Sequence, residues 1–202
     1  MIPASVRAAA RASHDMLRAR GVPSLLVGGM AVDAYGYRRA TSDVDWLVPA
    51  ITVRDLPGNP LPPESGVYGK TIKVAAHEAS GTPVEVSVDF VGVPRTRGVR
   101  AEAWATLFQA PRDVGGLPAV ALEGLVLLKL VANRTKDGAD IVEILKRQGL
   151  GVGKDVRRWL RPNLVGEEGR DLLADYDMLV LTAASEAAGR RNPRSPLRRG
   201  GS

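Results

Sequence analysis

Two aspartates, Asp43 and Asp45, alternate with apolar residues in the segment 43–48, which reads as a strand. Successive side chains of a strand point to opposite faces, so both carboxylates share one face. Two carboxylates held side by side repel each other unless a cation joins them. Mg²⁺ is usually bound by one or two carboxylates together with the phosphates of a substrate. The pair therefore predicts a divalent metal site that takes a phosphorylated substrate.

A Gly-Gly pair precedes these aspartates, with thirteen residues between Gly29 and Asp43. Residues 24–27 predict a strand that ends at Gly28, and residues 30–35 predict a short helix. Glycine leaves no side chain between the backbone N–H groups and a ligand, and the N-terminal end of a helix favours phosphate. The segment therefore predicts a site for a nucleoside triphosphate and its metal. The alternative is an ordinary strand end with two solvated aspartates.

A third carboxylate is expected from a predicted hairpin, residues 71–77 and 84–90, because two alternating runs flank a Gly-containing connection. Glu85 and Asp89 share the face opposite the valines of the second run. Asp89, at the end of its strand, is the better candidate, and Glu85 is the reserve. The alternative is that both belong to a polar outer face.

A second polar cluster lies in the helical second half of the chain. Residues 121–132 are almost continuously apolar, which is typical of a buried helix, and Lys129 interrupts them. A buried ammonium needs an anion unless it reaches solvent. In the next predicted helix Asp137 and Asp140 lie on the core side, so they need a partner such as Lys129 or Arg134. The alternative places Asp137 at a helix N-terminus and Lys129 on the surface.

Together these residues resemble the nucleotidyltransferase superfamily, and within it the AbiEii-type, toxin-like enzymes of toxin–antitoxin systems. The resemblance rests on two blocks, Gly-Gly followed by Arg-x-Thr-x-Asp-x-Asp, and an apolar helix carrying Lys followed by Arg-x-Lys-Asp. The matching residues are Gly28, Gly29, Ala31, Gly36, Arg39, Thr41, Asp43, Asp45, Lys129, Arg134, Lys136, Asp137 and Asp140. One extra residue in the final spacing leaves open whether Asp137 or Asp140 takes the functional place of the family.

The resemblance implies an α+β fold, with a polymerase-beta-like mixed sheet, flanking helices and a C-terminal helical bundle. It also implies transfer of a nucleoside monophosphate from a nucleoside triphosphate such as ATP to an acceptor hydroxyl, with Mg²⁺ or Mn²⁺ as cofactor. The implied catalytic residues are Asp43, Asp45, Asp89 and Lys129, the first three of them as metal ligands. The implied nucleotide-binding residues are Gly28, Gly29, Arg39, Thr41, Lys129, Asp137 and Asp140.

Three functions stay open at this point. The first is a toxin that modifies RNA, with tRNA as the acceptor that the resemblance favours and a separate antitoxin as partner. The second is a nucleotidyltransferase that modifies a partner protein or a small molecule such as an aminoglycoside. The third is a nucleotide-binding module without turnover. Three aspartates placed for metal binding argue against the third, because a module without catalysis has no need of them.

Composition narrows the class of protein further. The 202 residues include no cysteine, which excludes disulfides and thiolate zinc sites and indicates a cytoplasmic protein. No apolar run is long enough to cross a membrane. The net charge of +6 is mostly local: five of the 28 basic residues lie in 190–202, which leaves 23 basic against 22 acidic residues in 1–189. Charge alone therefore does not establish an RNA substrate.

The predicted organisation has three parts: a nucleotidyltransferase core (1–118), a helical region packed on it (119–189) and a disordered basic tail (190–202). The Pro/Gly-rich residues 56–66 predict a loop long enough to cover the site. Residues 149–154 resemble a phosphate-binding loop but lack its spacing, so they predict a linker between helices.

Overall fold

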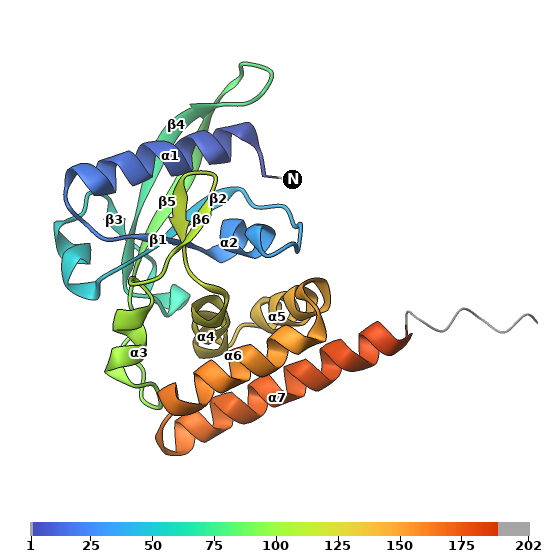
Figure 1. The fold of residues 1–202 in the computed structure, drawn as a ribbon. Helices are drawn as coiled ribbons and strands as arrows, with labels where there is room; N and C mark the ends of the chain where they lie inside the picture. The colour runs from blue at the N-terminus through green and yellow to red at the C-terminus, as the bar shows by residue number, and fades with distance from the viewer. Residues whose placement is uncertain (1, 190–202) are drawn as a thin grey trace, which may run out of the picture.

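The computed structural model describes residues 2–189, so the predicted basic tail lies outside the described residues. The chain has an α+β fold built on a seven-stranded mixed sheet (Figure 1). The helices are α1 (Ala4–Ala19), α2 (Gly28–Ala34), α3 (Ala101–Thr106), α4 (Leu122–Ala132), α5 (Thr135–Gln148), α6 (Leu150–Asn163) and α7 (Gly166–Gly189), with short turns of helix η1 (Ala50–Asp55) and η2 (Pro63–Ser65). The strands are β1 (Leu25–Val27), β2 (Asp43–Val48), β3 (Asn59–Pro60), β4 (Gly69–His77), β5 (Pro83–Gly92), β6 (Arg112–Val114) and β7 (Leu117–Ala119).

Strand β2, which carries Asp43 and Asp45, lies inside the sheet. The strand order is β3-β4-β5-β2-β1-β7-β6, so β2 pairs with β1 on one side and β5 on the other. It is antiparallel to β1 and parallel to β5, and it pairs with β5 along its whole length. An interior strand held on both sides is a rigid place for functional side chains.

The two faces of the sheet have different covers, and the alternation in β2 explains why. Val44, Trp46 and Val48 are fully buried in an apolar cluster with α1. Leu47 points the other way and joins a second cluster with α4, α5, α6 and α7. Figure 1 shows α1 on one side of the sheet and the helical bundle on the other. The predicted mixed sheet, flanking helices and C-terminal bundle are therefore confirmed.

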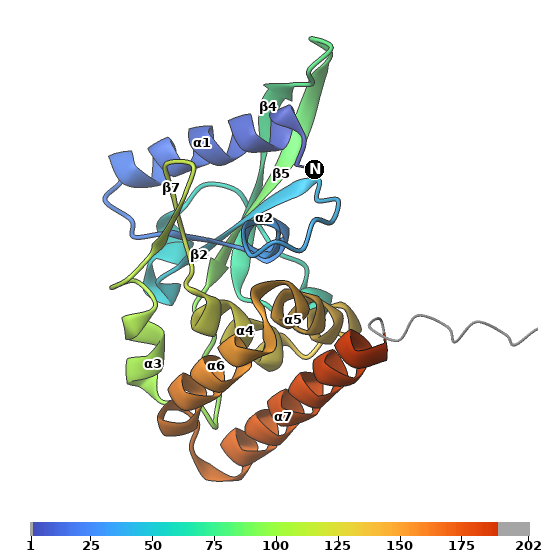
Figure 2. The same cartoon turned by 45° about the vertical axis from the view of Figure 1, so that its right-hand side comes forward.

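In the bundle, α6 and α7 run side by side (Figure 2). The predicted linker at 149–154 is wrong, because α6 begins at Leu150 and only Gly149, with φ +90°, connects it to α5. The Tyr176 hydroxyl of α7 donates a 2.9 Å hydrogen bond to the carbonyl of Gly153 in α6. A β-carbon on Gly153 would meet its nearest neighbours in α5 and α7 at 3.5–3.7 Å, which is ordinary van der Waals contact, so the helix contact does not itself require glycine. No helix within residues 2–189 is both long and apolar enough to cross a membrane.

The structure also differs from the sequence-based expectation at residues 112–119. The sequence predicts only a connector at 114–118. In the structure, residues 112–119 form the β6–β7 hairpin, which turns at Gly115 and Gly116 with φ values of +63° and +85°. Three-residue strands are too short to show a recognisable alternation. Strand β7 pairs in parallel with β1 and leads directly into α4, so it runs across position 118, the predicted end of the core.

Candidate active site

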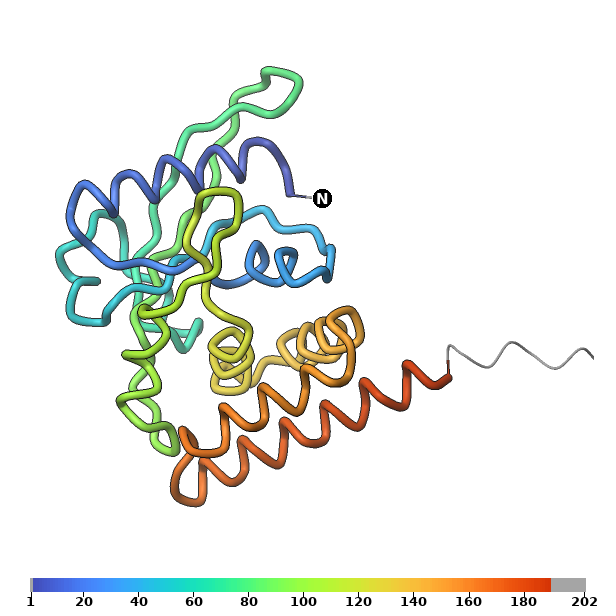
Figure 3. Tube along the Cα trace, viewed as in Figure 1, coloured from blue at the N-terminus to red at the C-terminus, as the bar shows by residue number. Residues whose placement is uncertain are grey.

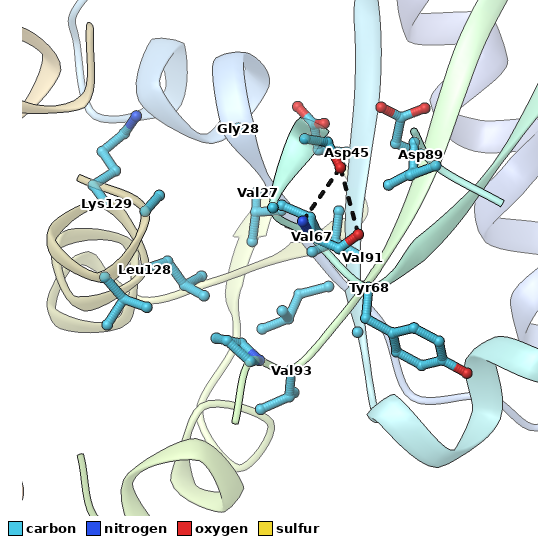
Figure 4. A pocket seen from close by; sticks show the side chains of 18 of the residues that line it. Val27, Gly28, Asp45, Val67, Tyr68, Asp89, Val91, Val93, Leu128 and Lys129 are labelled. Carbon is cyan, nitrogen blue, oxygen red and sulfur yellow. Dashed lines mark hydrogen bonds between the residues drawn. The ribbon is translucent and has the colours of Figure 1, made fainter. Parts of the chain in front are cut away.

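The three predicted carboxylates lie on two adjacent strands. Asp45 of β2 is paired in register with Asp89 of β5, and Asp43 is paired with Ser87. Neighbouring strands are about 4.8 Å apart, so Asp45 and Asp89 are direct neighbours on one face of the sheet. All three aspartates are half-buried. Figure 4 shows Asp45 and Asp89 beside each other, with Lys129 and Leu128 of α4 across the cavity. The reserve candidate Glu85 is exposed, farther out on the β4–β5 hairpin, which projects beyond α1 (Figure 3).

The environment of Asp45 disfavours the ionised form of its carboxyl group. Burial, followed by the charges of Asp43 and Asp89, raises its pKa from 3.8 to about 6. Such a group gains stability from a bound cation, because the cation offsets both causes of the shift. Among the described residues, however, no three His, Cys, Asp or Glu side chains are arranged to hold one ion together. Two neighbouring carboxylates are a ligand set that Mg²⁺ can share with substrate oxygens.

The Gly-Gly pair fits tightly against the residues that carry the site. Gly28 has φ +61°, and a β-carbon on it would lie 1.8 Å from Oδ2 of Asp45. A β-carbon on Gly29 would lie 2.5 Å from Oγ1 of Thr41. Thr41 in turn donates a 2.8 Å hydrogen bond to Oδ1 of Asp43. The missing side chains thus make room for Asp45 and for Thr41, which supports Asp43.

Lys129 is buried and bridges two helices. Its ammonium donates hydrogen bonds to Oδ1 of Asp137 at 2.8 Å and to Oδ2 of Asp140 at 2.6 Å. Lys129 is only 5% exposed, and the two aspartates are 1% and 2% exposed. The alternative of a surface lysine is therefore wrong, and the predicted pairing of the core-side carboxylates is confirmed. An ammonium has three donors, so two are already committed to α5.

Two arginines complete this cluster. Nε of Arg134 lies 2.6 Å from Oδ2 of Asp137, and Nε of Arg39 lies 3.7 Å from Oδ1 of Asp140. Burial alone would raise the pKa of Asp137, but hydrogen bonds from Arg134 and Lys129 outweigh it and lower that pKa. With three cations and two carboxylates, the cluster has a net charge of +1 next to the aspartates of the sheet.

A cavity of about 1210 Å³ lies between the carboxylate face of the sheet and α4. Most of the predicted site residues line it: Gly28, Gly29, Arg39, Asp43, Asp45, Asp89, Lys129 and Asp137. Thr41 and Asp140 are absent from its lining, because Thr41 lies under Gly29 and Asp140 lies behind Lys129. The structure thus brings the two sequence blocks together, and it separates side chains that face the cavity from those that support them.

The cavity also contains residues that the sequence did not single out. The predicted covering loop, residues 56–66, contributes Leu61 and Glu64 among others, and Tyr68, two residues beyond it, also lines the cavity and is 59% exposed. Arg54 and Arg95 also line the cavity. In the sequence, the only sign that either arginine belongs to the site is that Arg95 follows Asp89 by six residues. Their place depends on how η1 and the end of β5 meet.

Comparisons with known proteins give only distant structural likenesses, since neither a protein-family model nor a curated protein matches the chain. A candidate nucleotidyltransferase from H. pylori is 10% identical, with a TM-score of 0.41, over 85% of this chain and 90% of that one. An antigenic nucleotidyltransferase-like protein from Paracoccidioides brasiliensis is 12% identical, with a TM-score of 0.41, over 94% and 91%. Similarity at this level is too weak to transfer an activity or a family to this chain.

Proposed function

We propose that the protein is a metal-dependent nucleotidyltransferase, which moves a nucleoside monophosphate from a nucleoside triphosphate to an acceptor hydroxyl. The observation that supports this most is the in-register pair Asp45–Asp89, with Asp43 on the same cavity wall and a cationic cluster on the opposite wall. Carboxylates for a metal and cations for phosphates are the two parts that phosphoryl transfer needs.

Asp43 and Asp45 would hold Mg²⁺, which when bound supplies positive charge for the phosphate oxygens. Arg134 and Lys136 line the wall where the triphosphate would bind, and Lys129 has one N–H left beyond those given to α5. Asp89 would accept the proton of the acceptor hydroxyl. The acceptor oxygen then bonds to the α-phosphorus, the bond from that phosphorus to the bridging oxygen breaks, and pyrophosphate leaves.

The acceptor that we propose is RNA, with tRNA as the first candidate, and the biological role is that of a toxin restrained by an antitoxin. This finer assignment rests on the resemblance of the two sequence blocks to AbiEii-type enzymes. The size of the cavity is consistent with it, because about 1210 Å³ exceeds the roughly 300–1,000 Å³ usual for a small-molecule site. There is room for part of an acceptor beside the triphosphate.

The test is transfer of label from each of the four α-labelled nucleoside triphosphates, with Mg²⁺, into the RNA and protein of a bacterial extract. We expect label in a tRNA-sized band, lost to background in Asp43→Asn and Asp45→Asn while far-UV circular dichroism stays unchanged. Asp15→Asn, an exposed aspartate on α1, is the matched control and should transfer normally. Label in a protein band would show that the acceptor is a protein and not RNA. Undiminished transfer by both Asp43→Asn and Asp45→Asn would refute the assignment of these residues to the active site.

A further inference from the structure

A second cavity, of about 660 Å³, adjoins the first one. The two share Ala50 of η1 and the segment 93–96 that follows β5. The remaining walls come from the loop after this segment and from α3, including Trp104 and Phe108. The carboxylate cavity is thus continued by an open, largely apolar hollow, which is called the second chamber below.

The position of this chamber limits what it can bind during the reaction. Val93 lies four residues beyond Asp89 in the direction of β5, which at about 3.3 Å per residue is roughly 13 Å. The reacting hydroxyl of an acceptor would be at Asp89. An occupant of the second chamber is therefore a part of the acceptor at a distance from its reacting end.

All charged side chains that line the second chamber are positive. Its lining contains two charged residues, Arg95 and Arg97, and no acidic residue within the described part of the chain. Both arginines are exposed, and neither forms a hydrogen bond or ion pair with another described side chain. Unpaired guanidinium groups beside apolar walls are complementary to a ligand that carries phosphates and flat bases.

We infer that the second chamber binds the single-stranded part of an RNA acceptor next to its reacting nucleotide. Arg95 and Arg97 contact backbone phosphates, and a base packs against the half-buried ring of Phe108, beside Trp104, which is buried at 7% exposure. Base contacts of this kind tolerate different sequences, because every base has a flat apolar face. The inference rests on the proposed function and adds where the acceptor lies and what holds it.

The experiment measures binding without turnover, so its outcome does not depend on label transfer. A 5′-fluorescein single-stranded oligoribonucleotide is titrated with the full chain, without nucleotide or metal, and its anisotropy is followed at several salt concentrations. The double variant Arg95→Ala/Arg97→Ala should bind at least about tenfold more weakly. The slope of log K against log salt should fall by about 1.4, because each phosphate contact on a single strand contributes about 0.7. Arg11→Ala, an exposed arginine on α1, is the matched control and should bind like the wild type.

A second readout tests the chamber directly. RNA should quench part of the tryptophan fluorescence of the wild type, and Trp104→Phe should remove that quench while keeping the affinity. Equal RNA affinity and salt slope in the double variant and the wild type would overturn the inference, even if label transfer to RNA is found. Loss of nucleoside triphosphate affinity with unchanged RNA affinity would also overturn it, because the chamber would then belong to the donor. A quench that persists in Trp104→Phe would show that the RNA lies elsewhere.

Discussion

At the scale of single residues, the site depends on the packing of two glycines against two supported aspartates. Gly28 is adjacent to Asp45 because Val27, the residue before it, is the register partner of Asp45 in β1. The pairing of β1 with β2 therefore brings Gly28 close to Asp45, and this close approach requires glycine at position 28. The Gly-Gly turn can thus set the position of a carboxylate in the candidate site without contacting a ligand itself.

We predict that Gly28→Ala abolishes most activity for a local reason. The new β-carbon would overlap Oδ2 of Asp45, so the carboxylate must move, and a displacement of 1 Å in an active site can cost about 10²-fold in rate. Gly21→Ala is the matched control, because its φ of +64° is nearly that of Gly28 while nothing lies within 4 Å of the added carbon. Both variants should lose about 1–2 kcal/mol of stability from the left-handed backbone. Only Gly28→Ala should lose nucleotide transfer, and equal activities of the two would contradict the steric argument.

The raised pKa of Asp45 predicts how stability changes with pH in the metal-free protein. Between about 4 and 6 the folded state keeps a proton on Asp45 that the unfolded chain releases, so the free energy of unfolding contributed by this residue falls as pH rises. Asp45→Asn cannot titrate. We therefore expect the free energy of unfolding of the variant, relative to that of the wild type and with both measured in EDTA, to increase by roughly 1–3 kcal/mol from pH 4 to pH 7. Urea denaturation across this pH range measures the difference, and a gap that is constant with pH would show that Asp45 titrates normally.

At the scale of secondary structure, the cationic wall of the cavity is a contact between two helices. Lys129 is in the last turn of α4, and Asp137 and Asp140 are in the first half of α5. Between the helices, Asn133 is the C-cap of α4 with φ +47°, which reverses the chain within a few residues. The polar cluster thus holds α4 and α5 together while it places Lys129 and Arg134 at the cavity.

We predict that Lys129→Met lowers the free energy of unfolding by about 3–5 kcal/mol, because two buried carboxylates lose the ammonium group that they share. Lys136→Met, an exposed lysine in α5, is the control for loss of charge and should change stability by less than about 0.5 kcal/mol. Adding Asp140→Asn to Lys129→Met should recover part of the loss, since one unpaired charge is removed. Strictly additive losses in urea denaturation would show that the two residues are not coupled.

At the scale of the whole molecule, the cavity exists because both halves of the chain pack on one sheet face. The carboxylates come from β2 and β5, and the opposing cations come from Arg39 and from the helices after position 121. One apolar cluster joins Leu25 and Leu47 of the sheet to α4–α7, so the distance across the cavity is set by core packing. A buried shared core of this kind makes the site as rigid as the fold itself.

Local sequence patterns were sufficient for the elements and for the residue types of the site. Alternation placed Asp43, Asp45 and Asp89 on strand faces, because the period of a strand is two residues and apolar neighbours fix which side is buried. The cost of burying an ammonium predicted a partner for Lys129, and the structure supplies two. The β6–β7 hairpin and the start of α6 escaped prediction, because very short strands and a glycine-rich first turn of a helix carry little periodic signal.

Spatial pairing was decided by the tertiary structure alone. Local patterns do not say which strands become neighbours, so they could not place Asp45 opposite Asp89 or Gly28 against Asp45. The same holds for Arg95, Arg97 and Trp104, which form one chamber only because α3 folds against the end of β5. The sequence by itself therefore determined which groups could do chemistry, through charge and periodicity. The packing of the sheet against its helices decided which of them face one another, because that distance depends on the whole core.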